Sequence, residues 1–281
     1  MNTIDLHIHS SASDGSDSIP ELLEKIQDSG ITAFSVTDHD TIDGAVEMQS
    51  LVPENIQYVM GIEFTCVMPC GQCHILGYRF DPDCPAMQEA LAHGKALRSR
   101  KLIRRLELME QRFGIRLTEE EMDWLRSRKS PCKPHIANIL VKRGLFPDNT
   151  AAIAEVLDHC EVPNSRIDAE EAVTAIRLSG GIPVWAHPLG GEGEDLLTQE
   201  EFHTRLAFLK GAGVQGLECF YSRYSPEEIA FLRDAARENQ LLVSAGSDYH
   251  GTNKKNITLG KLNADGRDVP EEKITLLPAL F

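Results

Sequence analysis

The sequence lacks the long apolar stretches that would place a chain in a membrane. None of its apolar runs approaches the roughly 20 residues that a bilayer-spanning helix needs. The N-terminus lacks a basic stretch followed by an apolar core, and a first predicted strand begins at Thr3, so no signal peptide is expected. Internal repeats and low-complexity segments are also absent, which argues against a repeat architecture. These absences predict a globular protein of the cytoplasm.

The number of cysteines in this chain argues against a disulfide framework. There are seven cysteines, an odd number, which fits a reducing compartment. Cys70 and Cys73 precede His74, with Cys66 nearby, but no second CxxC pair follows. Because a structural zinc site usually draws on two separated ligand pairs, a zinc knuckle is the weaker interpretation of these residues.

Positive charge is scarce overall and concentrated in one block. The net charge is −15, which by itself argues against a polyanionic partner. Residues 95–143, however, contain 14 Lys and Arg against 6 Asp and Glu, so this window carries +8 and the rest of the chain −23. Such a block is often a solvated helical face. On an otherwise acidic protein it also favours an anionic substrate bound near the block.

Two histidines, His7 and His9, lie in an apolar run near the N-terminus. The run Thr3–Ser10 is apolar or β-branched at alternate positions, so it predicts a buried strand. Side chains two residues apart on a strand point to the same side, so Asp5, His7 and His9 project together. Two rigidly held imidazoles make half of a metal site, with Asp5 as an outer partner that orients them. Taken alone, the pattern fits two hydrogen-bonded core histidines about as well.

More histidines and carboxylates stand at or near the ends of other predicted strands. Three predicted apolar strands are followed by candidate ligands, which are His39, His187, and Asp248 with His250. Glu63 lies inside a fourth apolar run. Unpaired carboxylates are rarely buried, so this many together favour a shared metal centre over a structural accident. The candidate ligands are His7, His9, Asp14, His39, Glu63, His74, His187, Asp248 and His250.

Strand-like and helix-like segments alternate along most of the chain, which predicts an α/β fold. Ser18 to Glu21 and Thr118 to Glu121 are capping-box patterns that open two of the helices. No strand is expected between about residues 95 and 165, so this stretch, which overlaps the basic block, is interpreted as a helical insertion. The expected strands lie near 3–10, 31–37, 56–67, 72–79, 182–187, 214–220 and 241–247.

A closed ring and an open sheet of strands would both bring residues at strand carboxyl ends together. Candidate ligands come from the first, second, fifth and last predicted strands. They converge more easily around a closed ring, so the sequence favours a barrel, with an open doubly wound sheet as the alternative.

Taken in order, these motifs resemble those of the PHP (polymerase and histidinol phosphatase) family, which belongs with the amidohydrolase-like metal barrels. The resemblance implies a distorted (β/α)7 TIM-like barrel made of residues 1–95 and 165–281, with residues 96–164 as a helical insertion that caps the substrate. The matching runs are Asp5–Ser10, Ser13–Gly15, Thr37–Asp40, Gly61–Glu63, His74–Gly77, Ala186–Pro188 and Gly246–His250.

The resemblance also implies up to three divalent metals and a division of the ligands among them. Mixed imidazole and carboxylate ligands suit Mn²⁺, Fe²⁺ or Zn²⁺, and Mn²⁺ is the expected ion. Glu63, Asp248 and His187 are assigned the catalytic roles. The implied sets are His7, His9, Glu63 and Asp248 for one metal, Glu63, His74 and His187 for a second, and Asp14, His39 and His250 for the third.

Within the family, the runs Ser35–Thr41 and Lys133–Ala137 are similar to bacterial nucleoside 3′,5′-bisphosphate phosphatases and to related 5′→3′ exoribonucleases acting on short RNA. This resemblance implies removal of the 3′-phosphate from a small nucleotide by a hydroxide that bridges two metals, because metal binding lowers the pKa of water to about 7. The chain has neither a nucleophile elbow nor a Gly-rich phosphate loop, so no other route to phosphate hydrolysis is indicated.

A second phosphate on the substrate needs cations outside the metal ligands. Lys133 and His135 begin a predicted insertion helix, whose dipole favours anions. Arg79, Arg177 and Arg223 flank predicted strands, and all five residues are candidates for substrate binding. Each could instead pair with a surface carboxylate.

Several other functions share these features. A histidinol-phosphate phosphatase or an exoribonuclease would use the same barrel, and a metal-dependent amidohydrolase or deaminase would manage with fewer metals. Asp14, His39 and His250 favour phosphate chemistry because they supply a third metal set. A non-catalytic RNA-binding module should have lost ligands, and none of the expected positions is missing. Neither a membrane nor an obligate protein partner is indicated.

Overall fold

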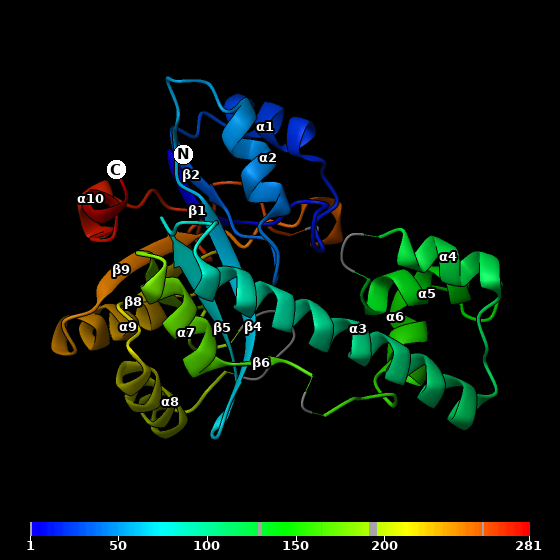
Figure 1. The fold of residues 1–281 in the computed structure, drawn as a ribbon. Helices are drawn as coiled ribbons and strands as arrows, with labels where there is room; N and C mark the ends of the chain where they lie inside the picture. Colours follow the sequence, from blue (N-terminus) through cyan, green and yellow to red (C-terminus); the bar gives the residue numbers. More distant parts are fainter. Residues whose placement is uncertain (1, 129–130, 164, 191–195, 255) are drawn as a thin grey trace. The chain divides into compact units, whose positions relative to one another are not determined.

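The computed structural model describes residues 2–128, 131–163, 165–190, 196–254 and 256–281 (Figure 1). The chain divides into two compact units. One unit, here the α/β unit, comprises Met1–Ala92 and Ile167–Phe281, and the other, the helical unit, comprises His93–Arg166. Each unit has its own arrangement of elements.

The α/β unit is a mixed α/β fold built on two sheets. In the three-stranded sheet, β1 (Ile4–Ile8), β2 (Ala33–Val36) and β3 (Gln57–Tyr58) are parallel. All residues of β1 and β2 are buried, so the polar side chains among them, Asp5, His7 and Ser35, lie in the interior. The six-stranded sheet has the order β6 (Ile167–Asp168), β4 (Gly61–Met68), β5 (Gly71–Tyr78), β7 (Ile182–Ala186), β8 (Gly216–Tyr221) and β9 (Leu242–Gly246).

Two backbone bridges join the two sheets. At one edge the His9 amide donates to the Tyr249 carbonyl over 2.8 Å. The second bridge, between His39 after β2 and Glu63 in β4, includes a hydrogen bond from the Glu63 amide to the Asp38 carbonyl over 3.2 Å. These bridges bring ligand-bearing ends of β1, β2, β4 and β9 next to one another.

The direction of β5 differs from that of its neighbours. It is antiparallel to both β4 and β7, whereas β7, β8 and β9 are mutually parallel. Only two residues separate β4 from β5, which is the hairpin connection that antiparallel strands allow. The sequence predicted this pair of strands but not the consequence, which is that residues after β5 lie at the opposite end of the sheet from residues after β7.

Helices of the α/β unit follow the predicted alternation and have clear start signals. The Ser18–Glu21 capping box is present at the start of the first helix, where the Ser18 amide donates to Glu21 over 2.9 Å. Ile19, Leu22 and Ile26 form the buried face of that helix, at the spacing of an amphipathic helix. The helices are α1 (Ile19–Asp28), α2 (Asp43–Leu51), α7 (Ala169–Leu178), α8 (Gln199–Ala212), α9 (Pro226–Glu238) and α10 (Leu277–Leu280), with short 3₁₀ turns at η2 (Gly251–Asn253) and η3 (Glu271–Lys273).

The helical unit has a separate apolar core. The long helix α3 (Pro85–Phe113) begins in the α/β unit and continues into the helical unit. It is followed by α4 (Glu119–Arg126), α5 (Lys133–Lys142), α6 (Asn149–Ala152) and the π-helical turn η1 (Ile153–Leu157). The buried side chains of this core include Met109, Leu125, Ile136, Leu140 and Leu157.

The predicted elements are largely confirmed, with three differences. The strand expected near 56–67 is two strands, β3 and β4, in different sheets. Within the stretch expected as a helical insertion, α6 changes to a π-helical turn at Ile153. The two-residue strand β6 was not expected, because two residues carry no periodicity. Among the described residues, no helix combines the length and hydropathy that a membrane span requires.

Candidate metal centre

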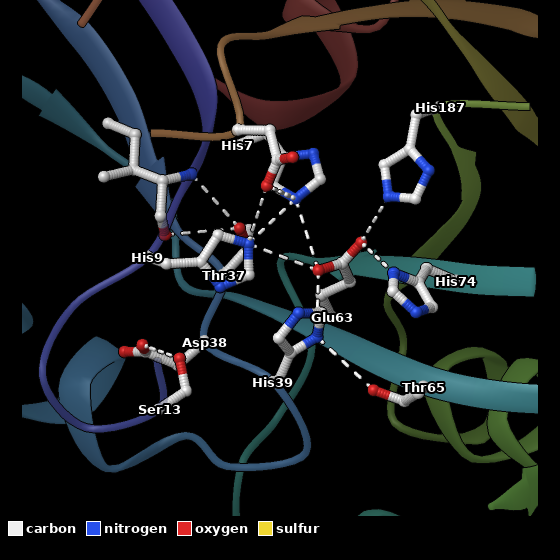
Figure 2. Close-up of polar contacts among 12 residues, drawn as sticks. His7, His9, Ser13, Thr37, Asp38, His39, Glu63, Thr65, His74 and His187 are labelled. Atoms are coloured by element: carbon white, nitrogen blue, oxygen red, sulfur yellow. Dashed lines mark hydrogen bonds and ion pairs between the residues drawn. The ribbon is translucent and has the colours of Figure 1, made fainter. Parts of the chain in front are cut away.

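Five of the nine ligand candidates surround the carboxylate of Glu63 (Figure 2), and these are His7, His9, His39, His74 and His187. Strand β1 supplies His7, His9 directly follows the last residue of β1, and β4 supplies Glu63 near its start. His74 comes from the middle of the antiparallel strand β5, not from a strand end. The others follow strands or lie in loops after them, and these are Asp14, His39, His187, Asp248 and His250.

The two oxygens of Glu63 face separate groups of imidazoles. Oε1 lies 3.1 Å from Nδ1 of His74 and 3.1 Å from Nε2 of His187. Oε2 lies 3.3 Å from Nε2 of His7, 3.2 Å from Nε2 of His9 and 3.0 Å from Nδ1 of His39. A carboxylate arranged in this way has one oxygen available to each of two neighbouring cations.

His9 also has two faces in the centre. Its Nε2 lies 3.2 Å from Glu63 and 3.3 Å from Oδ1 of Asp248. Its Nδ1 points to the other side, 3.6 Å from Oδ1 of Asp14. On that side Asp14 Oδ1 lies 3.2 Å from Nε2 of His250, and Asp14 Oδ2 lies 3.7 Å from Nε2 of His39. The carboxylate of Asp14 therefore faces three imidazoles, of which His9 and His39 also face Glu63.

Three sets of donor atoms in the described chain are compact enough to hold a metal ion. Within each set, the ligand atoms all lie within 4.8 Å of one another. Two of the sets agree in part with the sets that the family resemblance implied, but His39 replaces His187 in the set with His74. The sets are His9, Asp14, His39 and His250; His7, His9 and Glu63; and His39, Glu63 and His74.

Several buried polar atoms of the centre are left without hydrogen bonds. Glu63 Oε2, His9 Nδ1 and His250 Nε2 make none with any residue that the structure describes. Buried polar atoms normally find a partner, so their orphaned state needs an explanation. Imidazole nitrogens and carboxylate oxygens are ligands for divalent transition metals, and the residues present therefore fit such ions.

Asp248 is held from both sides. Its Oδ1 faces the imidazoles of His7 and His9, at 3.6 and 3.3 Å. Its Oδ2 accepts a hydrogen bond from the Tyr221 hydroxyl over 3.1 Å and pairs with Nζ of Lys254 over 2.7 Å. Only Oδ1 is thus directed to the metal-binding atoms. The sequence offered no periodic or motif signal for Lys254, which follows the last ligand by four residues.

Glu218 is a functional residue that the sequence analysis missed. This fully buried side chain lies in the middle of β8. Its Oε1 accepts from Nδ1 of His7 over 2.8 Å, and its Oε2 accepts from the backbone amide of His187 over 2.7 Å. A carboxylate inside the apolar run 216–221 was the available signal, the same one that singled out Glu63.

Glu218 takes the role expected of Asp5. By accepting from Nδ1 of His7, it leaves Nε2 of that ring to face Glu63. Asp5 instead accepts from the Ser247 amide, the Ser247 hydroxyl and the Gly260 amide, at 2.9, 2.6 and 2.8 Å. The expectation that Asp5 orients the imidazoles is therefore wrong, because its carboxylate stabilises the loop after β9.

The electrostatics of the centre favour bound positive charge. Burial alone would raise the pKa of Glu63, but the charges of His39, His7 and His74 outweigh burial and hold it well below its usual range. Burial would lower the pKa of His9, but Asp248 and Glu63 raise it to about 9. Carboxylates that stay charged and imidazoles that attract protons mark a site where protons and metal ions compete.

Burial separates the deep part of the centre from its rim. The side chains of His7, His9 and Glu63 are 0% exposed. At the rim, Asp14 is 34% exposed and His74 is 24% exposed. Among the described ligand candidates, Asp14 and His74 are therefore on the side of the centre that faces solvent.

Two candidate ligands have backbone conformations that their residue types rarely adopt. His187 and Asp248 follow β7 and β9 with φ angles of 28° and 60°. Such conformations persist where surrounding contacts enforce them, which is common at functional sites. At Gly246, just before this turn, an added Cβ would lie 2.2 Å from the Cβ of His7, so only glycine lets β1 and β9 approach this closely.

Two of the five predicted substrate-binding residues lie at the wrong end of the sheet. Arg79 follows Tyr78, which is paired with Ile182 at the start of β7, whereas His74 is paired with Ala186 at the end of β7. The antiparallel direction of β5 thus places Arg79 away from His187. The guanidinium of Arg177 packs against Gly213, before the parallel strand β8, and so also lies at the amino ends of the strands.

The other three predicted residues have different surroundings. Arg223 is half-buried and follows β8 on the same side of the sheet as His187. In the helical unit, Lys133 pairs with Asp158 over 2.5 Å. Nδ1 of His135 lies 3.0 Å from Sγ of Cys132, and its ring packs edge-on against Trp124.

Comparison with known sequences supports a single family. The family described as PHP domain matches residues 5–159, which is more than half of the chain. The chain is 29% identical to the 5′-3′ exoribonuclease of Haemophilus influenzae, over 88% of this chain and 89% of that protein. It is 28% identical to a phosphoribosyl 1,2-cyclic phosphate 1,2-diphosphodiesterase of Eggerthella lenta (88% and 94%) and 26% identical to a 3′,5′-nucleoside bisphosphate phosphatase of Chromobacterium violaceum (89% and 88%).

A solved structure gives the same result at the level of the fold. The crystal structure of a metal-dependent phosphoesterase from Bifidobacterium adolescentis matches with a TM-score of 0.80 and 27% identity. The match covers 98% of this chain and 96% of that one. The α/β unit and the helical unit are therefore both contained in the matched region.

Proposed function

The chain belongs to the PHP domain family of metal-dependent phosphoesterases, and from that premise we propose that it removes the 3′-phosphate of nucleoside 3′,5′-bisphosphates. A relative with that activity by name covers most of the chain. The hydrolase class follows from the family, whereas the substrate is our inference.

The observation that carries the proposal is the bridging position of Glu63. One of its oxygens faces His74 and His187, and the other faces His7, His9 and His39. This arrangement supports two neighbouring metal ions. The compact set around Asp14 supports a third, and Mn²⁺ is the ion that we propose for all three positions.

Bound divalent ions would acidify water and neutralise phosphate oxygens. The protein residues provide the geometry for that chemistry. Glu218 holds His7 and the backbone of His187, and Tyr221 and Lys254 hold Asp248. We assign the catalytic roles to Glu63, Asp248 and His187. Each comes from a different strand or strand end, and each faces the other candidate ligands.

We also propose that the strands of the α/β unit close into a TIM-like barrel. The bridge between Ile8 and Tyr249 joins the edge strands β1 and β9, and the bridge between His39 and Glu63 joins the end of β2 to β4. A ring formed in this way would run through β1, β2, β4, β5, β7, β8 and β9.

A 5′→3′ exoribonuclease acting on short RNA is the second candidate, since a relative of that name is the most similar in sequence of those described above. Both activities need a metal centre that accepts a phosphate ester from the rim. They differ in the length of the substrate, so the same assay panel separates them.

The first test is metal dependence combined with a substrate panel. Protein treated with a chelator should lose activity on p-nitrophenyl phosphate and regain it with Mn²⁺. The restored enzyme is then assayed with adenosine 3′,5′-bisphosphate, 5′-phosphorylated short RNA and histidinol phosphate. Full activity in protein shown by elemental analysis to be metal-free would refute the proposal. Faster hydrolysis of the short RNA than of adenosine 3′,5′-bisphosphate would favour the second candidate.

The second test concerns the residues proposed to bind the second phosphate, Lys133, His135 and Arg223. Lys133→Ala and His135→Ala should raise KM for adenosine 3′,5′-bisphosphate and affect p-nitrophenyl phosphate much less. A lost charge-assisted hydrogen bond corresponds to about tenfold or more in kcat/KM. Equal losses on both substrates would mean that these residues support the fold instead.

A further inference from the structure

The helical unit contains a thiol and an imidazole in direct contact. Sγ of Cys132 lies 3.0 Å from Nδ1 of His135, within reach of a hydrogen bond. The backbone amide of Cys132 donates to the same nitrogen over 3.2 Å. An imidazole nitrogen that accepts from an amide carries a lone pair and no proton, so Nδ1 faces the sulfur as a base. The pair thus has the arrangement of a nucleophile with an adjacent general base.

The amino end of α5 adds a favourable potential for negative charge on this sulfur. Cys132 is the N-cap residue of α5, a ten-residue helix, and its side chain faces the His135 amide in a capping-box arrangement. Pro134, the second residue of the helix, has no amide to offer, which leaves the amide of His135 as the capping donor. The positive end of a helix dipole favours a thiolate over a thiol.

A cation also interacts with Cys132. Burial is the largest influence on the pKa of Arg105 and lowers it, whereas negative charges around the guanidinium raise that pKa, and a thiolate at Cys132 is one of these charges. Such an interaction is mutual, so the guanidinium favours the thiolate in return. The Nε of Arg105 donates to the carbonyl oxygen of Cys160 over 3.3 Å, which holds the guanidinium in place.

Cys132 differs in these surroundings from the other six cysteines. Four of them are buried, and these are Cys66, Cys73, Cys160 and Cys219. The other two, Cys70 and Cys84, are partly exposed like Cys132, but no imidazole of the described chain lies within hydrogen-bonding distance of either. Reactive cysteines are partly exposed and have electropositive surroundings, whereas buried cysteines are inert. Cys132 meets both conditions.

We propose that Cys132 is a site of modification by small disulfides, at which His135 takes the proton of the thiol and the sulfur acts as the nucleophile. With oxidised glutathione, the Cys132 thiolate attacks one of the two glutathione sulfurs. The bond between those sulfurs breaks, and a mixed disulfide forms at Cys132. The second glutathione leaves as a thiolate and takes up the proton that His135 holds, so the disulfide itself is the only oxidant.

Modification of Cys132 would alter a part of the chain that we assign to substrate binding. Lys133 and His135 lie one and three residues beyond it, in the first turn of α5. A glutathionyl group is bulky and anionic, and its attachment removes the thiol that contacts His135. This consequence rests on the proposed function, whereas the reactivity of Cys132 does not.

The reactivity is tested on the reduced, full-length protein with iodoacetamide over a range of pH. Peptide mass spectrometry follows alkylation of Cys132 and of Cys84, which is the control thiol within the same sample. The pH at half-maximal rate should be lower for Cys132 than for Cys84 by about one unit or more, because only Cys132 has a base in contact with its sulfur. Equal midpoints for the two cysteines would overturn the proposal.

His135→Asn separates proton transfer from packing. Asparagine can accept from the Cys132 amide but takes no proton at neutral pH, so the midpoint for Cys132 should rise toward that for Cys84. His159→Asn is the matched control, because it replaces an exposed histidine of the same unit, and its midpoint should equal that of the wild type. An unchanged midpoint in His135→Asn, or an equal rise in His159→Asn, would contradict the role of His135. The comparison within the wild type still decides if either variant fails to fold.

Activity after modification tests the consequence for the substrate. Metal-loaded enzyme treated with oxidised glutathione should lose about tenfold in kcat/KM for adenosine 3′,5′-bisphosphate, the scale of one charge-assisted contact, and much less for p-nitrophenyl phosphate. Dithiothreitol should reverse the loss, and Cys132→Ser should be active and insensitive to the disulfide. Unchanged kinetics on the bisphosphate with Cys132 fully modified would overturn this consequence. Failure of the proposed function looks different, because the enzyme would then hydrolyse neither ester while Cys132 kept its low pH midpoint.

Discussion

Nδ1 of His7 donates a hydrogen bond to Oε1 of Glu218 over 2.8 Å, although 211 residues separate the two in the chain. Both side chains are fully buried. The same carboxylate also accepts from the amide of His187. One strand residue thus fixes a ring from β1 and the turn after β7, and it links the two groups of imidazoles that face Glu63.

Glu218→Gln should weaken the metal centre while the fold remains intact. The amide can accept from only one of its two current donors, so either His7 or the turn at His187 loses its anchor. Loss of such an outer partner typically costs about 10–100-fold in metal affinity or activity. Competition between the protein and a fluorescent chelator for Mn²⁺ measures the affinity. A variant with unchanged Mn²⁺ affinity would show that Glu218 serves packing alone.

Glu63→Gln should be more damaging than any change outside the ligand set. The carboxylate contributes charge toward two groups of imidazoles, and a neutral amide cannot bridge two cations well. We expect turnover of p-nitrophenyl phosphate to fall more than about 100-fold, beyond the usual effect of outer partners. Metal content by elemental analysis should fall as well. Glu54→Gln, at an exposed position of the same unit, is the control. Full metal content with near-normal turnover in Glu63→Gln would contradict the bridging role.

Gly246→Ala should disrupt the approach of β1 to β9. The new methyl group would lie 2.2 Å from the Cβ of His7 and 2.8 Å from its backbone nitrogen, so the strands must separate. Overpacking of this kind costs about 1–3 kcal/mol of unfolding free energy. The control is Gly211→Ala in α8, where an added Cβ meets nothing within 4 Å and alanine favours the helix. Thermal melts should therefore move in opposite directions. Equal melting temperatures for both variants would argue against a tight contact at Gly246.

Glu121 should make the stability of the helical unit depend on pH. Its carboxylate pairs with Arg143 and caps α4 through the Thr118 amide, and these contacts lower its pKa below the usual value, with Arg143 as the largest cause. A lowered pKa means that the stabilisation is present above the unfolded pKa, near 4.5, and is lost as pH falls through the folded pKa. Glu121→Gln should therefore destabilise α4 by about 1 kcal/mol at pH 7.

Hydrogen exchange of peptides from α4 and α5 measures this effect. Faster exchange in Glu121→Gln than in the wild type is expected at pH 7, and the difference should shrink below pH 4.5. Glu120→Gln changes a neighbouring exposed residue and should leave exchange unaffected. A difference that persists at low pH would mean that the charge of Glu121 is not the cause.

The sequence by itself determined the local features of this protein. Alternation along β1 puts His7 and His9 on the same side, because side-chain direction repeats every two residues. The Ser18–Glu21 and Thr118–Glu121 patterns start helices where predicted, because both partners lie within one helical turn. The candidate ligands could also be identified from the sequence, because charged and imidazole side chains are unusual within apolar runs.

Only the tertiary structure decided which distant residues meet. Strand direction depends on which edges pair, and the reversal of β5 moved Arg79 to the far end of the sheet from His187. The pairing of β8 with β9, and the approach of β9 to β1, brought Glu218 to His7. The choice of Glu218 over Asp5 as the partner of His7 follows from the same geometry, because Ser247 and Gly260 occupy the oxygens of Asp5. Such choices depend on backbone hydrogen bonds between strands far apart in the chain, and no spacing along the sequence records them.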